Sequence, residues 1–218
     1  AGVVTEPIIE RNLKEVSLFF GDIGSPEAIE GYPGSLIQVP LVSGEITPIF
    51  LRMKPAAPLM EVAQTITVMA VHSALMMNMS PIILVGQNLG ALEGKTYATG
   101  TQYDSDQKYS DKVTIYLPSN DGGKIASVVS YRDMRDQMAR EAKTLLEYQK
   151  KKGFPISTLY NSTRGGAKIE GFPYCPLSEL EKTLQKGCAE EPLILKDEKV
   201  IDKKFSIEAI ENWRKGKM

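Results

Sequence analysis

The chain has 218 residues, and its 26 basic and 27 acidic residues leave a formal net charge of -1. This balance provides no basic excess for binding nucleic acid or an anionic membrane surface. Hydrophobic residues make up 42% of the chain, enough for the core of one α/β domain with an appendage. No apolar run approaches the ~18 residues of a transmembrane helix, and we expect no signal peptide. These features predict a cytoplasmic protein without nucleic-acid or membrane partners.

The N-terminal part of the sequence predicts short elements separated by loops. A short strand ends at Val4, and residues 7–20 predict a helix. The stretch 21–34 is rich in glycine and proline and predicts a loop. Residues 36–42 and 46–51 predict short strands, and a proline in each confines it to a sheet edge or a loop.

The central part of the sequence predicts longer elements. Apolar residues at helical spacing predict a helix over residues 60–79. The unbroken apolar run 81–85 predicts a buried strand, and residues 113–117 predict another. Residues 131–152 predict a long amphipathic helix ended by a glycine, and 156–160 predict a strand.

The order of these elements indicates the fold class. Helix, apolar strand, loop, strand, helix and strand alternate as in a largely parallel sheet covered on both faces. Residues 120–123 (NDGG) predict a turn between elements. We therefore expect an α/β protein with a doubly wound, mostly parallel sheet in residues 1–175. Residues 176–218 predict a charged, mostly helical C-terminal extension, and Cys175 and Cys188 at this end predict free thiols, although the two could pair.

Polar, glycine-rich loops follow two of the predicted strands. Gly86, Gln87 and Asn88 follow the run 81–85, and the sequence NSTRGGAKIEG follows 156–160. Ligands of doubly wound sheets sit beyond the carboxyl ends of the strands, where glycine permits close backbone approach. These loops predict a ligand site, whereas the alternative is that they only close turns with their own hydrogen bonds.

Two segments of the sequence resemble one family. SPIILVGQNLGALEGKTYATGT and YNSTRGGAKIEG resemble motifs of the Maf family, motility-associated factors that glycosylate bacterial flagellins. The resemblance covers roughly residues 64–171 and implies a GT-A-like, Rossmann-like core related to bacterial sialyltransferases. It implies that a nonulosonic acid, pseudaminic or legionaminic, moves from a CMP donor to serine or threonine of flagellin, with no cofactor besides this donor. The implied nucleotide-sugar site consists of Thr65, Thr67, Gly86, Gln87, Asn88, Lys95, Asn161, Thr163, Gly165 and Gly166.

Within this resemblance, chemical roles follow for a few side chains. Tyr97 aligns with a tyrosine that stabilises charge on the departing phosphate. The family's base histidine has no counterpart, so Tyr131 is the catalytic candidate in its place, with Asp133 or a residue outside this sequence as alternatives. His72, the one histidine of the chain, is expected to pack within its helix. Asn88 replaces an aspartate of the family pattern and cannot supply a strong metal ligand, so no metal site is expected.

Two further observations keep rival functions open. The family's glycine-rich loop after the first strand is absent, and the GDIGS sequence of residues 21–25 does not replace it. Either an upstream part precedes Ala1 or half of the donor site is lost, which would leave a non-catalytic module that binds nucleotide or flagellin. The fold family also implies a rival enzyme, an archaeal-type hydroxymethyl-dihydropterin pyrophosphokinase using ATP. Asn88 speaks against that enzyme, since its chemistry needs acidic metal ligands.

Overall fold

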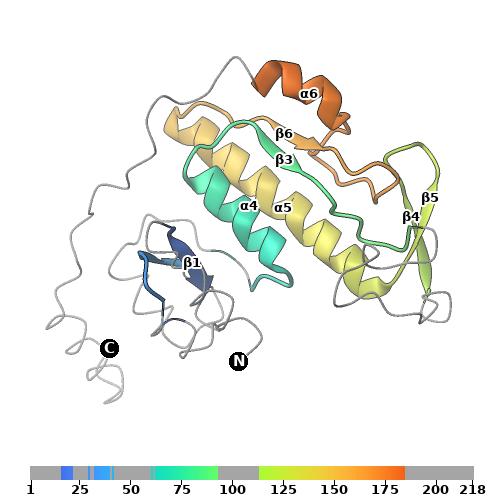
Figure 1. Ribbon diagram of the computed structural model, residues 1–218, viewed down its shortest axis with the longest axis horizontal. Helices are drawn as coiled ribbons and strands as arrows, with labels where there is room; N and C mark the ends of the chain where they lie inside the picture. The colour runs from blue at the N-terminus through green and yellow to red at the C-terminus, as the bar shows by residue number, and fades with distance from the viewer. Residues whose placement is uncertain are drawn as a thin grey trace, which may run out of the picture. The chain divides into compact units, whose positions relative to one another are not determined.

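The computed structural model describes residues 16–21, 29, 32–39, 41, 60, 62–92 and 113–184. The chain divides into two compact units, Ala1–Val62 with Ala189–Met218, and Ala63–Cys188. Both helices and strands occur, so the expected mixed α/β class is confirmed (Figure 1). The boundary expected between the α/β domain of residues 1–175 and the extension of residues 176–218 stays a prediction.

The first unit contains two short parallel strands. Strand β1 (Leu18–Gly21) pairs with β2 (Leu36–Val39), with Leu18 opposite Leu36. The strand predicted over residues 36–42 is therefore confirmed over 36–39, whereas the helix predicted over 7–20 is wrong at its C-terminal end. Leucine and two phenylalanines in β1 favour a strand once a second apolar strand can pair with them. Strand predictions at residues 3–4 and 46–51 fall outside the described residues.

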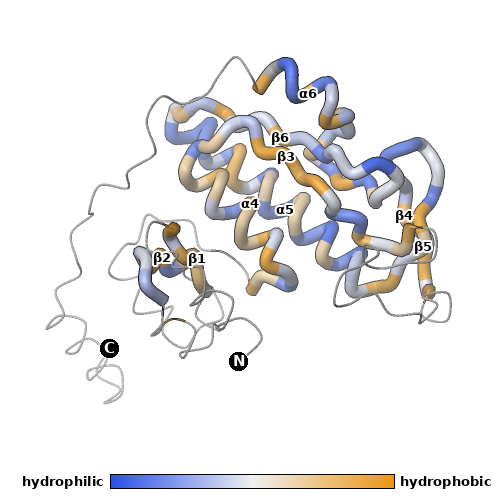
Figure 2. The backbone as a smooth tube through the Cα atoms, in the orientation of Figure 1, coloured by the Kyte–Doolittle hydropathy of each residue, from blue (hydrophilic) through white to orange (hydrophobic). Residues whose placement is uncertain are grey.

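The second unit contains a parallel pair of strands. Strand β3 (Ile82–Leu84) pairs with β6 (Leu159–Asn161), with Leu84 opposite Asn161. Figure 2 shows the apolar run of β3 in orange, with more hydrophilic residues after it. The strand is shorter than the predicted run 81–85, because Val85 lies past its end and is 64% exposed.

A hairpin completes the strands of this unit. Strands β4 (Ile115–Pro118) and β5 (Lys124–Ser127) pair antiparallel. The turn between them contains the predicted NDGG sequence, and Gly122 adopts a left-handed φ of 88°. Strand β5 was not predicted, so this region is a hairpin and not the single strand expected in a parallel sheet.

Helices flank the β3–β6 pair. Helix α4 (Ile66–Met76) begins later than the predicted residue 60, because the Thr65 side chain caps it by accepting the Thr67 N–H at 3.4 Å. The predicted long helix is confirmed as α5 (Val129–Lys152), which ends at Gly153 with a left-handed φ of 70°.

The C-terminal extension begins with a helix. Helix α6 (Leu177–Leu184) confirms the start of the predicted helical tail, and residues from 185 onward lie outside the described residues. Cys175 carries a free thiol as expected, whereas Cys188 lies outside the described residues. Among the helices of the described part, none has the length and apolar character needed to cross a bilayer.

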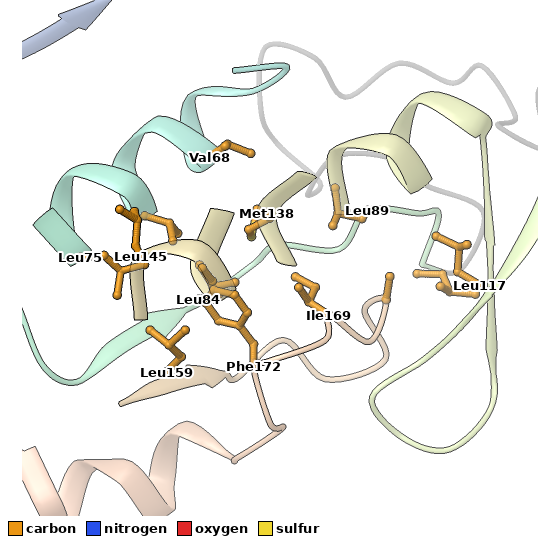
Figure 3. Packing of buried hydrophobic residues seen from close by; sticks show 14 residues of the cluster. Val68, Leu75, Leu84, Leu89, Leu117, Met138, Leu145, Leu159, Ile169 and Phe172 are labelled. Atoms are coloured by element: carbon orange, nitrogen blue, oxygen red, sulfur yellow. The ribbon is translucent and has the colours of Figure 1, made fainter. Parts of the chain in front are cut away.

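The core of the second unit lies between α4, α5, the β3–β6 pair and the hairpin (Figures 1 and 3). Phe172 and Ile169 reach this core from the segment after β6, each 1% exposed. The buried cluster consists of Val68, Val71, Leu75, Leu84, Leu89, Leu117, Ile125, Met138, Ala142, Leu145, Leu159, Ala167, Ile169 and Phe172.

Polar side chains also join α4 to α5 within this core. His72 Nδ1 lies 3.3 Å from Glu141 Oε1, and His72 is only 4% exposed, as expected for a packed helix residue. The Gln149 amide nitrogen donates to the Leu75 carbonyl at 2.8 Å and to Ser157 Oγ at 2.9 Å. The Gln149 carbonyl oxygen accepts the Ser157 N–H at 2.9 Å. One glutamine therefore ties the ends of two helices to the segment that leads into β6.

Replacing Gln149 with alanine should lower the free energy of unfolding by about 3 kcal/mol, because it leaves the buried Ser157 N–H without its acceptor and removes a donor from the Leu75 carbonyl. Urea unfolding measures this change, and Lys150→Ala on the exposed neighbouring residue is the matched control. Equal losses in the two variants would contradict the role assigned to Gln149.

Candidate functional site

The polar loops after β3 and β6 lie next to each other. The two strands are parallel and in register, so their carboxyl ends meet at one edge. Ser162 N–H donates to the Leu84 carbonyl at 2.8 Å, and Ala167 N–H donates to the Asn88 carbonyl at 2.8 Å. The two loops predicted to form one site are therefore hydrogen-bonded to each other.

Side chains extend this contact to the start of α4. The Gln87 N–H donates to Thr163 Oγ1 at 3.0 Å, which joins the exits of β3 and β6. The Thr67 hydroxyl donates to Gln87 Oε1 at 3.0 Å. Thr65 is the N-cap of the same helix. Residues from three predicted segments thus form one hydrogen-bonded group at the N-terminus of α4, where the helix dipole favours an anion.

The sequence motif after β6 contains residues with two different placements. Asn161 is fully buried, its Oδ1 accepts the Thr163 N–H at 3.0 Å, and its Nδ2 lies 3.4 Å from the Ala167 carbonyl. Thr163 is only 5% exposed. Both were predicted to bind nucleotide, and their placement makes them supports of the loop. Arg164, which follows Thr163, is exposed, so its guanidinium is accessible to an anion.

Gly166 permits the close approach of the two loops. A Cβ atom at this position would lie 2.7 Å from Thr163 Cγ2 and 3.3 Å from Asn88 Cα. Gly86, on the other loop, is exposed and has a left-handed φ of 73°, with no atom within 4 Å of an added Cβ. Gly166 therefore allows the two loops to pack closely, whereas Gly86 allows a left-handed backbone conformation at an open surface.

The turn between β4 and β5 also reaches this group, which the sequence analysis missed. Asn120 hydrogen-bonds the loop after β6, through its side-chain contact with Thr163, 43 residues away in the sequence, and its backbone contact with Gly166. The Ser119 hydroxyl donates to Asp121 and, with the Gly123 N–H and the charge of Arg164, lowers the pKa of that carboxyl below its usual 3.8. The NDGG sequence predicted a turn, but a local sequence pattern does not indicate which distant residues the turn contacts.

Of the two catalytic candidates, Tyr97 and Tyr131, the structure describes only Tyr131. Lys95 and Tyr97 lie outside the described residues. Tyr131 and Asp133 lie in the first turns of α5, where Tyr131 packs against the core and Asp133 pairs with Arg132 Nη2 at 2.9 Å. The hydrogen bonds that join the two loops do not include either residue.

A cavity of about 840 Å³ lies along α5, and its lining contains none of the predicted site residues. Four basic and three acidic side chains line it, so it has little net charge. Its lining consists of Pro118, Arg135, Asp136, Ala139, Arg140, Ala142, Lys143, Leu146, Glu147, Lys168, Glu170 and Gly171.

Comparison with protein-family models, with curated proteins and with solved structures found no match to this chain. Among the described residues, no group of three histidine, cysteine or acidic side chains could hold a metal ion.

Gly166→Ala should destabilise the protein by about 1–3 kcal/mol, because the new methyl group overlaps Thr163 and presses on the Asn88 backbone. Gly123→Ala is the matched control, since an added Cβ there meets its nearest atoms at 3.6 and 3.7 Å. Thermal unfolding compares the two variants. Equal stability of both would show that the loops do not need their close approach.

The lowered pKa of Asp121 makes the hairpin turn sensitive to acid. A carboxyl whose pKa is lower in the folded protein stabilises the fold above its unfolded pKa and loses this effect as pH falls through the folded pKa. An NMR titration of Asp121 should therefore give a midpoint below 3.8. As the pH falls from 3.8 through this midpoint, the free energy of unfolding should decrease more in the wild type than in Asp121→Asn. A midpoint at or above 3.8 would contradict the contacts assigned to Asp121.

Proposed function

We propose that the chain carries the donor site of a glycosyltransferase that moves a nonulosonic acid, pseudaminic or legionaminic, from CMP to serine or threonine of flagellin. The observation that carries this proposal is the hydrogen-bonded convergence of the two Maf-like loops, joined by Gln87 N–H and Thr163 Oγ1 at 3.0 Å. We also propose that β3 and β6 are neighbouring strands of a doubly wound sheet, in which such loops form the ligand site.

The accessible groups of the two loops suit a phosphorylated nucleoside. Gly86 leaves the backbone open, and the partly exposed amides of Gln87 and Asn88 can donate and accept without net charge. The exposed Arg164 guanidinium can pair with a phosphate through two hydrogen bonds. The N-terminus of α4, with the Thr67 hydroxyl beside Gln87, adds a partial positive charge.

The proposed reaction is a single inverting displacement. The acceptor hydroxyl oxygen bonds to the anomeric carbon of the sugar while the bond from that carbon to the CMP phosphate oxygen breaks. The phosphate keeps the electron pair, and the Tyr97 phenol, aided by Lys95, stabilises the growing charge. The hydroxyl proton passes to a base, for which Tyr131 and Asp133 are the candidates. The reaction needs no metal, and a cytoplasmic flagellin chain is the acceptor.

Isothermal titration calorimetry tests the class of ligand. The chain should release or absorb heat with CMP or CTP but not with ATP and magnesium. Binding of ATP with magnesium in place of CMP would instead favour the pyrophosphokinase. If no nucleotide binds, the proposed transferase is wrong, and a module without turnover remains.

Tyr97→Phe should reduce sugar transfer to flagellin by at least about 100-fold, because one donor to the leaving group is lost. CMP affinity and thermal stability should stay near those of the wild type. Tyr116→Phe, on a side chain that is 67% exposed in the hairpin, is the matched control. Unchanged glycosylation by Tyr97→Phe, measured by intact-protein mass spectrometry, would remove Tyr97 from the mechanism.

A further inference from the structure

We propose that the turn between β4 and β5 is a third component of the site, and that Asn120 is a positioning residue for the loop of residues 163–166. The inference rests on the proposed function only for the identity of the ligand. The sequence indicates no role for this turn beyond reversing the chain.

Asn120 holds both ends of the loop. Its backbone N–H donates to the Gly166 carbonyl at 2.9 Å, and its side-chain Nδ2 donates to the Thr163 carbonyl at 2.9 Å. A third contact closes the loop from inside, where Gly166 N–H lies 3.3 Å from the same Thr163 carbonyl. Ser119, beside Asn120, forms a bridge with Ala167 at the end of the loop. The turn therefore fixes the loop at the carbonyl groups of Thr163 and Gly166 and at its exit.

Thr163 connects Asn120 to the other residues of the proposed site through hydrogen bonds. Thr163 Oγ1 accepts the Gln87 N–H at 3.0 Å, and Gln87 Oε1 accepts the Thr67 hydroxyl at 3.0 Å. A shift of Thr163 would therefore move the exit of β3 and its contact with α4. Asn120 stands at the start of a continuous chain of hydrogen bonds that crosses the site.

Two further features of the turn point to a role beyond chain reversal. Asn120 Oδ1 is buried and has no hydrogen-bond partner within the described structure. A buried acceptor without a donor carries a cost in stability, so the side chain is held in place at a cost by its Nδ2 contact. The charge of Arg164 also acts on Asp121, the next residue of the turn. The turn therefore contacts the backbone of the loop, and one of its side chains senses the charge of Arg164.

Amide hydrogen exchange without ligand tests the positioning role directly. In Asn120→Ala, the Gln87 and Gly166 amides should exchange about tenfold faster than in the wild type. The amides of Met138 and Leu145 in α5 should keep their wild-type rates, and Lys124→Ala, on an exposed residue of the same hairpin, should change neither group. Equal acceleration throughout the unit, or none at Gln87 and Gly166, would overturn the proposal. If Asn120→Ala does not fold, Asn120→Asp removes the same donor and should give the same local pattern.

Calorimetry with CMP separates this inference from the proposed function. The wild type and Lys124→Ala should bind CMP equally, and Asn120→Ala should bind about tenfold more weakly. If the wild type and Asn120→Ala bind CMP with the same Kd, the positioning role is wrong and the proposed function stands. If the wild type binds no CMP, the proposed function is wrong, and the exchange rates alone decide whether Asn120 fixes the loop.

Discussion

The hydrogen bond from Gln87 N–H to Thr163 Oγ1, 3.0 Å long, joins two segments that are 76 residues apart in the chain. It forms because β3 and β6 are parallel and in register, which brings both strand exits to one edge. Around it, the Asn88 carbonyl accepts the Ala167 N–H, and Gly166 leaves room for the contact. Without this hydrogen bond, each loop would keep fewer contacts with the other.

The polar residues of the two motifs divide into supports and accessible groups. Asn161 and Thr163 are buried and form hydrogen bonds within the chain, which makes the loop rigid and costs little because their polar atoms have partners. Gly86, Asn88 and Arg164 are at least partly exposed. Buried residues of a motif can therefore hold a loop in shape without being exposed themselves, and a preorganised loop reduces the entropy cost of any binding.

The elements that could be predicted from the sequence have a local signal, whereas those that could not depend on distant partners. Helix α5 could be predicted because its apolar periodicity runs over many turns and ends at Gly153, whose left-handed φ suits a helix end. Strand β1 could not, because a short apolar run forms a strand only when β2 pairs with it. The join of the two loops followed from parallel topology, whereas the contacts of Asn120 depend on a hairpin whose second strand has no strong pattern.

NMR spectra of the ¹⁵N-labelled chain during titration with CMP test the central claim most directly. The account predicts that the amide signals of Gln87, Thr163 and Gly166 shift together and saturate with one Kd. Signals from the residues that line the cavity along α5 should stay in place. Shifts confined to that cavity, or no shift at any CMP concentration, would contradict the claim that the two loops form one nucleotide site.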